Sequence, residues 1–284
     1  MRRIDHLIKD AKLSINMQDD EAVTDYLSCS FLNKCQEFIQ GLIFTQSPES
    51  RIFRGEVVFS STVGIDSYQL PFDVYAKNSI NNVSYVTSNG VSKYYSNIPC
   101  ISERNRGSAW GYFTSENKII FSPVPSDSKQ ISISYNKKLP SLSTRYGKIQ
   151  TVNTNVSIVL EAGYSELVND DFFSVVDADG KIIKCGLRIN QTGNTILLTD
   201  TTDILVGHYV VLGKYATTHC RLPDECESAM IMALQKLISA RMASTMLPVE
   251  KAFSDEFSGM IASLFAENDG DSFIPPITEF TEWF

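Results

Sequence analysis

The chain lacks the features that would place it in a membrane or in an oxidising compartment. No run of about 18 apolar residues occurs in its 284 residues, so no transmembrane helix is expected. Met1-Arg-Arg-Ile-Asp-His has two arginines but no apolar stretch behind them, so no signal peptide is expected. The six cysteines form no Cys-x-x-Cys pair. Scattered reduced thiols are therefore predicted, together with synthesis in the cytoplasm.

Motifs of catalysis are also missing. The sequence has no His-Glu-x-x-His, no Gly-x-Ser-x-Gly, no phosphate-binding loop and no dinucleotide fingerprint. Its only histidines, His6, His208 and His219, are interpreted as structural or surface residues. Cys220 and Cys226 follow His219 at a spacing that matches no standard zinc site. We therefore expect no enzyme, no metal and no cofactor, although a distant pair of catalytic carboxylates would leave no linear signature.

Basic clusters interleaved with aromatics are absent as well, so sequence-specific nucleic-acid binding is not expected. The net charge of −8 is unevenly distributed. Residues 51–145 hold 11 Lys and Arg against 6 Asp and Glu, whereas residues 249–284 hold one Lys against 8 Asp and Glu. One interpretation is solvated surface. The other is complementarity between subunits, with an acidic end that meets basic surface on a neighbour.

Apolar residues at helical spacing occur near both ends of the chain. The apolar residues Ile4, Leu7, Ile8, Ala11, Leu13 and Ile15 predict a first helix. A second helix is predicted to begin at Asp19-Asp20-Glu21, where carboxylates favour the helix dipole, and to end between Gly41 and Pro48. Leu222-Pro-Asp-Glu predicts the start of a third helix that continues to Met246. After Pro248 a fourth helix is expected through Phe265.

Between these helices the apolar period changes to two, which is typical of strands. The first β block has candidate strands at 56–61, 66–71, 80–87, 118–123 and 130–135, with Asn89-Gly90 and Pro123-Val-Pro125 as turns. The second has candidates at 157–160, 172–176, 182–185, 195–198 and 209–212, with turns at Asp179-Gly180 and Gly193-Asn194.

The last seventeen residues, Asn268 to Phe284, form an acidic segment with a proline pair and large aromatics. Pro275 and Pro276 prevent a helix, and the apolar residues lack partners for a core of their own. Such side chains are better explained as anchors that become ordered on another subunit. The alternative is that the segment folds back on its own subunit. The candidate anchors are Phe273, Ile274, Pro275, Pro276, Ile277, Phe280, Trp283 and Phe284.

Taken together, these patterns predict an α+β protein in which helices from both chain ends pack as one core. An antiparallel β domain and a second, inserted small β-barrel or sandwich are expected to project from that core. The predicted divisions are residues 1–50 and 218–268 for the helical core, 51–145 and 146–217 for the two β domains, and 269–284 for an extended docking tail.

Three passages resemble head-to-tail adaptor (connector) proteins of short-tailed bacteriophages, similar to the tail tubular protein A family. The first is the end of the N-terminal helix pair, Phe38-Ile-Gln-Gly-Leu-Ile43. The second combines Tyr68-Gln-Leu-Pro-Phe-Asp73, Lys118 to Pro125, and Ile131-Ser-Ile-Ser-Tyr-Asn-Lys-Lys-Leu-Pro140. The third is Leu222-Pro-Asp-Glu225 leading to Asn268-Asp-Gly-Asp271. The resemblance covers residues 1–145 and 218–284 and rests on a pattern, with no single diagnostic motif.

The resemblance implies a structural virion protein, made in the host cytoplasm and located at the portal vertex. It implies a homo-oligomeric ring of about twelve copies below the portal protein, which extends the channel for double-stranded DNA. DNA would pass without sequence-specific binding, and like charge would keep it from sticking. The ring would be the platform for a downstream tail (nozzle or tubular) protein, and the C-terminal segment would dock on the portal.

A different class of function also fits the sequence. The second β block could be a tail or baseplate module that binds host-surface glycan. Its candidate aromatics are Tyr164, Phe172, Phe173 and Tyr209, although aromatic residues in strands more often belong to a core.

Overall fold

A computed structural model describes residues 2–17, 22–46, 53–75, 79–86, 92–98, 111–161 and 171–253. The chain divides into two compact units. The first unit contains Met1–Pro48 and Pro140–Glu267, and the second contains Glu49–Leu139. We describe each unit separately.

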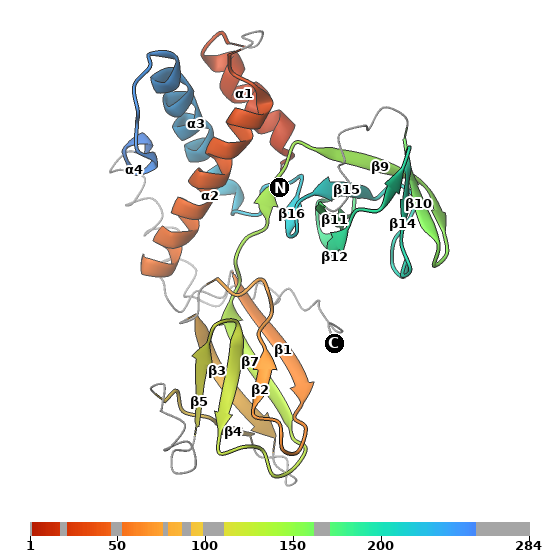
Figure 1. The fold of residues 1–284 in the computed structure, drawn as a ribbon. Coiled ribbons are helices and arrows are strands. Elements are labelled where there is room, and N and C mark those ends of the chain that lie inside the picture. Colours follow the sequence, from red (N-terminus) through yellow and green to blue (C-terminus); the bar gives the residue numbers. More distant parts are fainter. Residues whose placement is uncertain are drawn as a thin grey trace. The chain divides into compact units, whose positions relative to one another are not determined.

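The first unit contains all four described helices: α1 (Ile4–Ser14), α2 (Asp25–Gln46), α3 (Glu227–Met242) and the short α4 (Val249–Ala252). A 3-10 turn, η2 (Asp224–Cys226), leads into α3. Most of the predicted stripe of α1 is buried, with Ile4, Leu7 and Ala11 all fully inaccessible. Leu13 was predicted to belong to the stripe, but it is 44% exposed. Cys35 of α2 shares a buried cluster with Ala233 and Leu237 of α3 and with Ala252 of α4. Figure 1 shows α1, α2 and α3 lying side by side.

Three helix ends differ from the sequence prediction. The fourth helix was expected to run through Phe265, but α4 ends at Ala252 and Phe253 is extended; residues 254–265 lie outside the described residues. Helix α2 begins at Asp25, after Ala22 and Val23, rather than at the preceding acidic run. The reason is a cap that the carboxylate pattern obscured: the Leu27 N–H donates to Oγ1 of Thr24 at 3.2 Å, which satisfies a free helix-end donor. Helix α3 ends at Met242, four residues earlier than predicted.

The second unit consists of two antiparallel sheets whose inner faces share one core (Figure 1). One sheet has the order β1-β7-β3-β4 and the other β2-β6-β5. Tyr85 and Tyr135 from the first sheet meet Tyr112 and Phe121 from the second in a buried cluster. The strands are β1 (Arg54–Ser60), β2 (Ser67–Gln69), β3 (Ile80–Val86), β4 (Ser92–Tyr94), β5 (Gly111–Ser115), β6 (Lys118–Ser122) and β7 (Gln130–Asn136).

The second β block belongs to the first unit and forms a curled, half-barrel antiparallel sheet of seven strands. Their order is β12-β11-β15-β9-β10-β14-β13. The strands are β9 (Tyr146–Asn153), β10 (Ser157–Leu160), β11 (Phe172–Val176), β12 (Ile182–Arg188), β13 (Gln191–Thr192), β14 (Thr195–Leu197) and β15 (Tyr209–Leu212). The first and last strands of this order are consecutive in the chain. At their joint Ile189 N donates to Asp171 O and Leu197 N donates to Asn190 O, so backbone pairing continues on both sides.

Two predicted turns are confirmed in this sheet. Gly193-Asn194 joins β13 to β14. At Asp179-Gly180, Oδ1 of Asp177 accepts the backbone N–H groups of Asp179 and Lys181, at 2.9 and 2.8 Å. This side chain closes the turn by hydrogen bonding to the following backbone.

A short extended segment after the second unit is fixed to α2 by side-chain amides. It contains β8 (Ser141–Leu142), which pairs in parallel with β16 (Ala216–Thr217). Asn33 accepts the Leu142 N–H at 2.7 Å and donates to the Leu142 carbonyl at 2.9 Å. Gln36 donates to the Pro140 carbonyl at 2.9 Å. The amides of α2 thus supply partners that a neighbouring strand would otherwise provide.

The fold is α+β, as predicted, with antiparallel pairing in both β blocks. Within the described residues no helix is both long enough and apolar enough to cross a membrane.

Candidate functional site

The predicted docking anchors, Phe273, Ile274, Pro275, Pro276, Ile277, Phe280, Trp283 and Phe284, lie outside the described residues. The described residues contain polar clusters, shallow depressions and aromatic groups, which are the other candidate sites.

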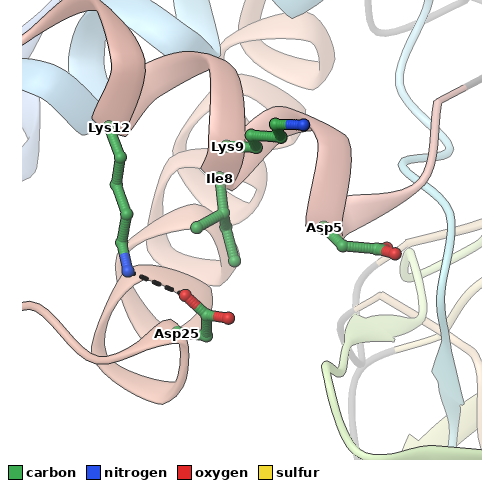
Figure 2. A pocket seen from close by; sticks show the side chains of 5 residues that line it. All are labelled: Asp5, Ile8, Lys9, Lys12 and Asp25. Atoms are coloured by element: carbon green, nitrogen blue, oxygen red, sulfur yellow. Dashed lines mark hydrogen bonds and ion pairs between the residues drawn. The ribbon is translucent and has the colours of Figure 1, made fainter. Parts of the chain in front are cut away.

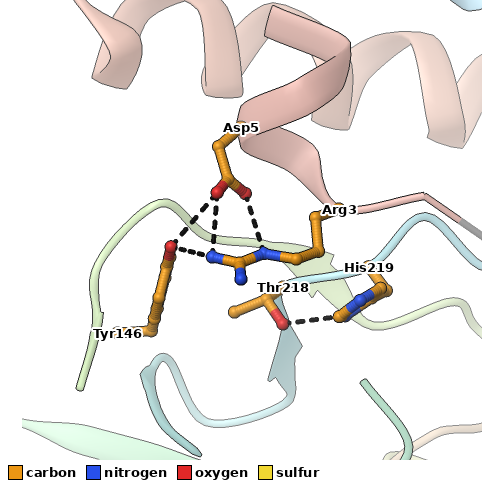
Figure 3. Close-up of polar contacts among 5 residues, drawn as sticks. All are labelled: Arg3, Asp5, Tyr146, Thr218 and His219. Atoms are coloured by element: carbon orange, nitrogen blue, oxygen red, sulfur yellow. Dashed lines mark hydrogen bonds and ion pairs between the residues drawn. The ribbon is translucent and has the colours of Figure 1, made fainter. Parts of the chain in front are cut away.

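A polar cluster fixes the N-terminal segment to the half-barrel sheet (Figure 3). Arg3 forms an ion pair with Asp5 at 2.8 Å and donates to the Tyr146 hydroxyl. Its guanidinium carbon lies 5.1 Å from the Tyr146 ring centroid and 5.9 Å from that of Tyr209. The backbone continues this contact, because Ile4 N donates to Thr218 O at 2.9 Å. Every charged group of the cluster has a partner within it, which is the arrangement of a structural joint.

His219 is the buried histidine of this joint, with 7% of its surface exposed. Its Nδ1 lies 2.9 Å from the Thr218 hydroxyl, and its ring lies directly against Gly180. Burial lowers the pKa of His219, and the nearby positive charges of Arg3 and Arg221 lower it further. The imidazole is therefore held neutral at neutral pH.

A shallow depression lies between α1 and the start of α2 (Figure 2). Its lining consists of Ile8 with two lysines, Lys9 and Lys12, and two carboxylates, Asp5 and Asp25. The Lys12 amine, largely buried, donates to Asp25 at 2.8 Å. A second depression crosses the outer face of β1, β7 and β3. Both are open surface features.

The described cysteines are all buried and unbridged. Cys220 contacts the Met230 sulfur at 3.6 Å. Burial raises the pKa of Cys220 to about 11 and that of Cys226 to about 12, which keeps both thiols protonated. Among the described residues no three His, Cys, Asp or Glu side chains gather as metal ligands would.

The aromatic residues proposed for glycan recognition are mostly engaged in other contacts. Phe173 is fully buried in the sheet core, so its assignment as a ligand-contacting residue was wrong. Tyr209 packs edge-on against Tyr146, with ring centroids 5.7 Å apart. Phe172 is half-buried beside two cations, and Tyr164 lies outside the described residues. The alternation of β11 places Phe172 and Phe173 on opposite faces, which explains the error.

Sequence reasoning missed the two cations beside Phe172. Cζ of Arg188 lies 5.5 Å from the Phe172 ring centroid, and Nζ of Lys214 lies 5.7 Å from it. The three residues are far apart in sequence and come together through pairing of β11 with β12 and the turn after β15. The register of the β11–β12 pair places Phe172 opposite Arg188 and could have indicated this one cation.

No family model matches the sequence. A search of curated proteins likewise finds no match for this chain.

Proposed function

We propose that the protein is a head-to-tail adaptor of a short-tailed bacteriophage. It would assemble as a ring of about twelve copies below the portal protein. This ring would extend the DNA channel and hold the downstream tail (nozzle or tubular) protein. In this proposal the helices from both chain ends form the core of the ring body, and the acidic C-terminal segment docks on the portal.

The observation that carries the proposal is the C-terminal sequence, in which large aromatic and aliphatic residues surround a proline pair. Desolvating such anchors contributes on the order of 1–2 kcal/mol each. On a ring the contributions from many copies combine, so that the attached state becomes very long-lived. The similarity of Tyr68-Gln-Leu-Pro71, Pro123-Val-Pro125 and the Ile131 strand to adaptor sequences supports the same proposal.

The surface of α3 gives further support for association with other subunits. This helix carries only three charged residues, Glu227, Lys236 and Arg241. Met232 is 54% exposed on it, and Met246 beyond its end is 96% exposed. Flexible methionine side chains are common at protein interfaces, and a ring of subunits would cover them.

The test is co-sedimentation of the full-length chain with the portal ring encoded beside it. A chain truncated after Asp269 is expected to lose stoichiometric binding. A full-length variant with Phe280, Trp283 and Phe284 changed to alanine is expected to lose it as well. The matched control changes the polar neighbours Thr278 and Thr281 to alanine and should bind normally.

The outcomes separate the parts of the proposal. Binding that survives truncation would retain the adaptor and reject the tail as its anchor. Failure of the unmodified protein to bind at micromolar concentration would reject the adaptor assignment. Glycan binding by the same protein, measured as a thermal shift with host-surface saccharides, would favour the alternative class.

A further inference from the structure

We propose that Arg188, Phe172 and Lys214 form a contact site for the phosphodiester backbone of duplex DNA. The inference rests on the proposed function for the source of the DNA, but the site itself is argued from its charges and geometry.

The two cations are available to an external anion. Arg188 and Lys214 are both exposed, and within the described part of the chain neither forms an ion pair with a carboxylate. Their recorded side-chain partner is the ring of Phe172. The neighbouring carboxylate in the chain, Asp171, is exposed and pairs with neither of them. The two cations share one ring and have no carboxylate partner among the described residues, so they leave local positive charge on a protein of net charge −8.

The local backbone holds the three side chains together. Phe172 and Arg188 are directly paired in the β11–β12 ladder. The Phe172 carbonyl accepts from Gly213 N at 2.8 Å, and the Lys214 carbonyl accepts from Gly186 N at 2.8 Å. Gly186 has φ +66°, and a side chain there would lie against the Lys214 stem. An added Cβ would make only ordinary van der Waals contact with Lys214, so the glycine is required by its positive φ and not by lack of space.

The ring orders both charges without neutralising them. A cation over an aromatic face is attracted by the ring quadrupole but keeps its full charge. The two charges lie no more than 11.2 Å apart, the sum of their distances to the ring. One strand of B-DNA presents a phosphate about every 3.4 Å along the axis, so both cations can reach the same backbone.

The chemistry of the site favours a polyanion over a small anion. An exposed strand surface does not enclose a small ion, and two solvated cations gain little from one. Duplex DNA offers many phosphates, and its binding is driven by release of condensed counterions even at exposed cations. Phosphate contacts of this kind carry no sequence information. A two-cation site would also be weak enough for DNA to move past it.

The experiment measures binding of the full-length protein to a fluorescent duplex of about 20 base pairs, by anisotropy, between about 50 and 200 mM salt. The test variant is the double substitution Arg188→Gln/Lys214→Gln. The expected result is weaker binding, with the slope of log K against log salt reduced in magnitude by about 1.8, because each lost phosphate contact removes about 0.9. Phe172→Leu, which keeps both charges but removes the ring, should weaken binding without reducing the slope as much.

Two matched controls distinguish a site from general charge. Lys9→Gln/Lys93→Gln removes the same net charge from other exposed positions and should leave the slope unchanged. The exchange Arg188→Lys/Lys214→Arg keeps both charges and should keep the slope of the unmodified protein. Equal loss in the Lys9/Lys93 control, an unchanged slope in the test variant, or no DNA binding at the lowest salt would each overturn the proposal.

Two further measurements separate this inference from its alternatives. A sulfated polysaccharide that binds through Arg188 and Lys214 when DNA does not would overturn the assignment to DNA. Portal co-sedimentation should be normal for the test variant. Its loss would assign the two cations to the portal interface instead. If the unmodified chain binds DNA but does not bind the portal, the adaptor function would be rejected and the DNA-contact site would be retained.

Discussion

The two β regions of this molecule build their cores from different side chains. The half-barrel sheet of the first unit is filled mainly by branched aliphatic residues, such as Ile149, Ile158 and Ile196, around the single ring of Phe173. The sandwich of the second unit is filled largely by aromatic rings, four of which are buried tyrosines: Tyr85, Tyr95, Tyr112 and Tyr135.

The difference determines how polar groups are handled. An aliphatic core excludes polar atoms altogether, so its stability depends on close packing alone. A tyrosine core must give each buried hydroxyl a partner. Tyr135 donates to Asp73 at 2.9 Å, and the Tyr68 hydroxyl at the sandwich edge accepts the Thr62 N–H at 2.8 Å. The first core should therefore be sensitive to lost volume, and the second to lost hydrogen bonds.

The largest expected effect is loss of volume in the aliphatic core. Phe173→Ala should destabilise the first unit by about 3–5 kcal/mol, because it removes a fully buried ring and leaves a cavity. Denaturant unfolding checks this, with each unit followed as a separate transition. Val156→Ala, at a position 60% exposed in the turn between β9 and β10, is the control and should change stability by less than about 0.5 kcal/mol. A similar loss in both variants would contradict the assigned core.

The next effect concerns the joint between the N-terminal segment and the half-barrel sheet. Gly180 has φ +76°, and a Cβ there would overlap the His219 imidazole. Gly180→Ala should therefore cost about 3 kcal/mol from backbone strain and overpacking. Gly193→Ala provides a matched control, because Gly193 has φ +60° but no atom within 4 Å of the added methyl group. It should cost only about 1–2 kcal/mol by thermal unfolding. Equal costs would mean that contact with His219 is unimportant.

Loss of a hydroxyl should matter in the tyrosine core. Tyr135→Phe keeps the ring but removes the donor to Asp73, and should destabilise the second unit by about 1–3 kcal/mol. Tyr94→Phe, at a ring 64% exposed, should have almost no effect on the same transition. A neutral Tyr135→Phe would indicate that Asp73 finds other donors on its own.

The smallest expected effects are opposite responses to pH. Burial and two arginines lower the pKa of His219 in the first unit. Stability from neutral His219 is thus complete above about pH 6.5 and is lost as pH falls through its lowered folded pKa. In the second unit burial raises the pKa of Asp73, against opposing effects of Lys137 and Tyr135. The contribution of protonated Asp73 to the stability of the second unit is complete below the ordinary carboxyl pKa. It is lost as the pH rises through the raised pKa of the folded state.

Variants at these two residues test the comparison by thermal unfolding at a series of pH values. His219→Gln should reduce the acid sensitivity of the first unit. Asp73→Asn should reduce the opposite trend in the second, and neither should alter the pH response of the other unit. A shared change in both units would show that the trends arise from net charge and not from these groups.

Sequence alone predicted several apolar strands well, although it missed β5, in which Tyr112 and Phe113 are buried. The predicted ranges for β10, β11 and β15 match the structure residue for residue. Sequence alone missed β9, because Lys148, Gln150 and Thr151 give little apolar signal. This strand is stabilised by its pairing with β10 and β15. Sequence alone also missed β4, which is exposed at every position. Such strands are specified by their neighbours and not by their own composition.

The candidate sites were harder to predict than the fold. An aromatic residue in a strand can face the core or the solvent, and the phase of β11 decided this for Phe172 and Phe173. The pair of cations beside Phe172 depends on strand register, which a local pattern does not encode. The predicted anchors of the C-terminal segment stay a prediction that the portal experiment addresses.

The contact between α2 and the segment at residues 140–142 has a consequence for how the sequence can vary. Asn33 and Gln36 bind only carbonyl and N–H groups of that segment, and every amino acid supplies a carbonyl. The side chains at positions 140–142 can therefore change over evolution without loss of the amide contacts, provided that position 142 is not proline. The two amides themselves cannot. Variation should thus be tolerated at the exposed position 141 and opposed at the two amides of α2, while burial of the side chains limits variation at positions 140 and 142.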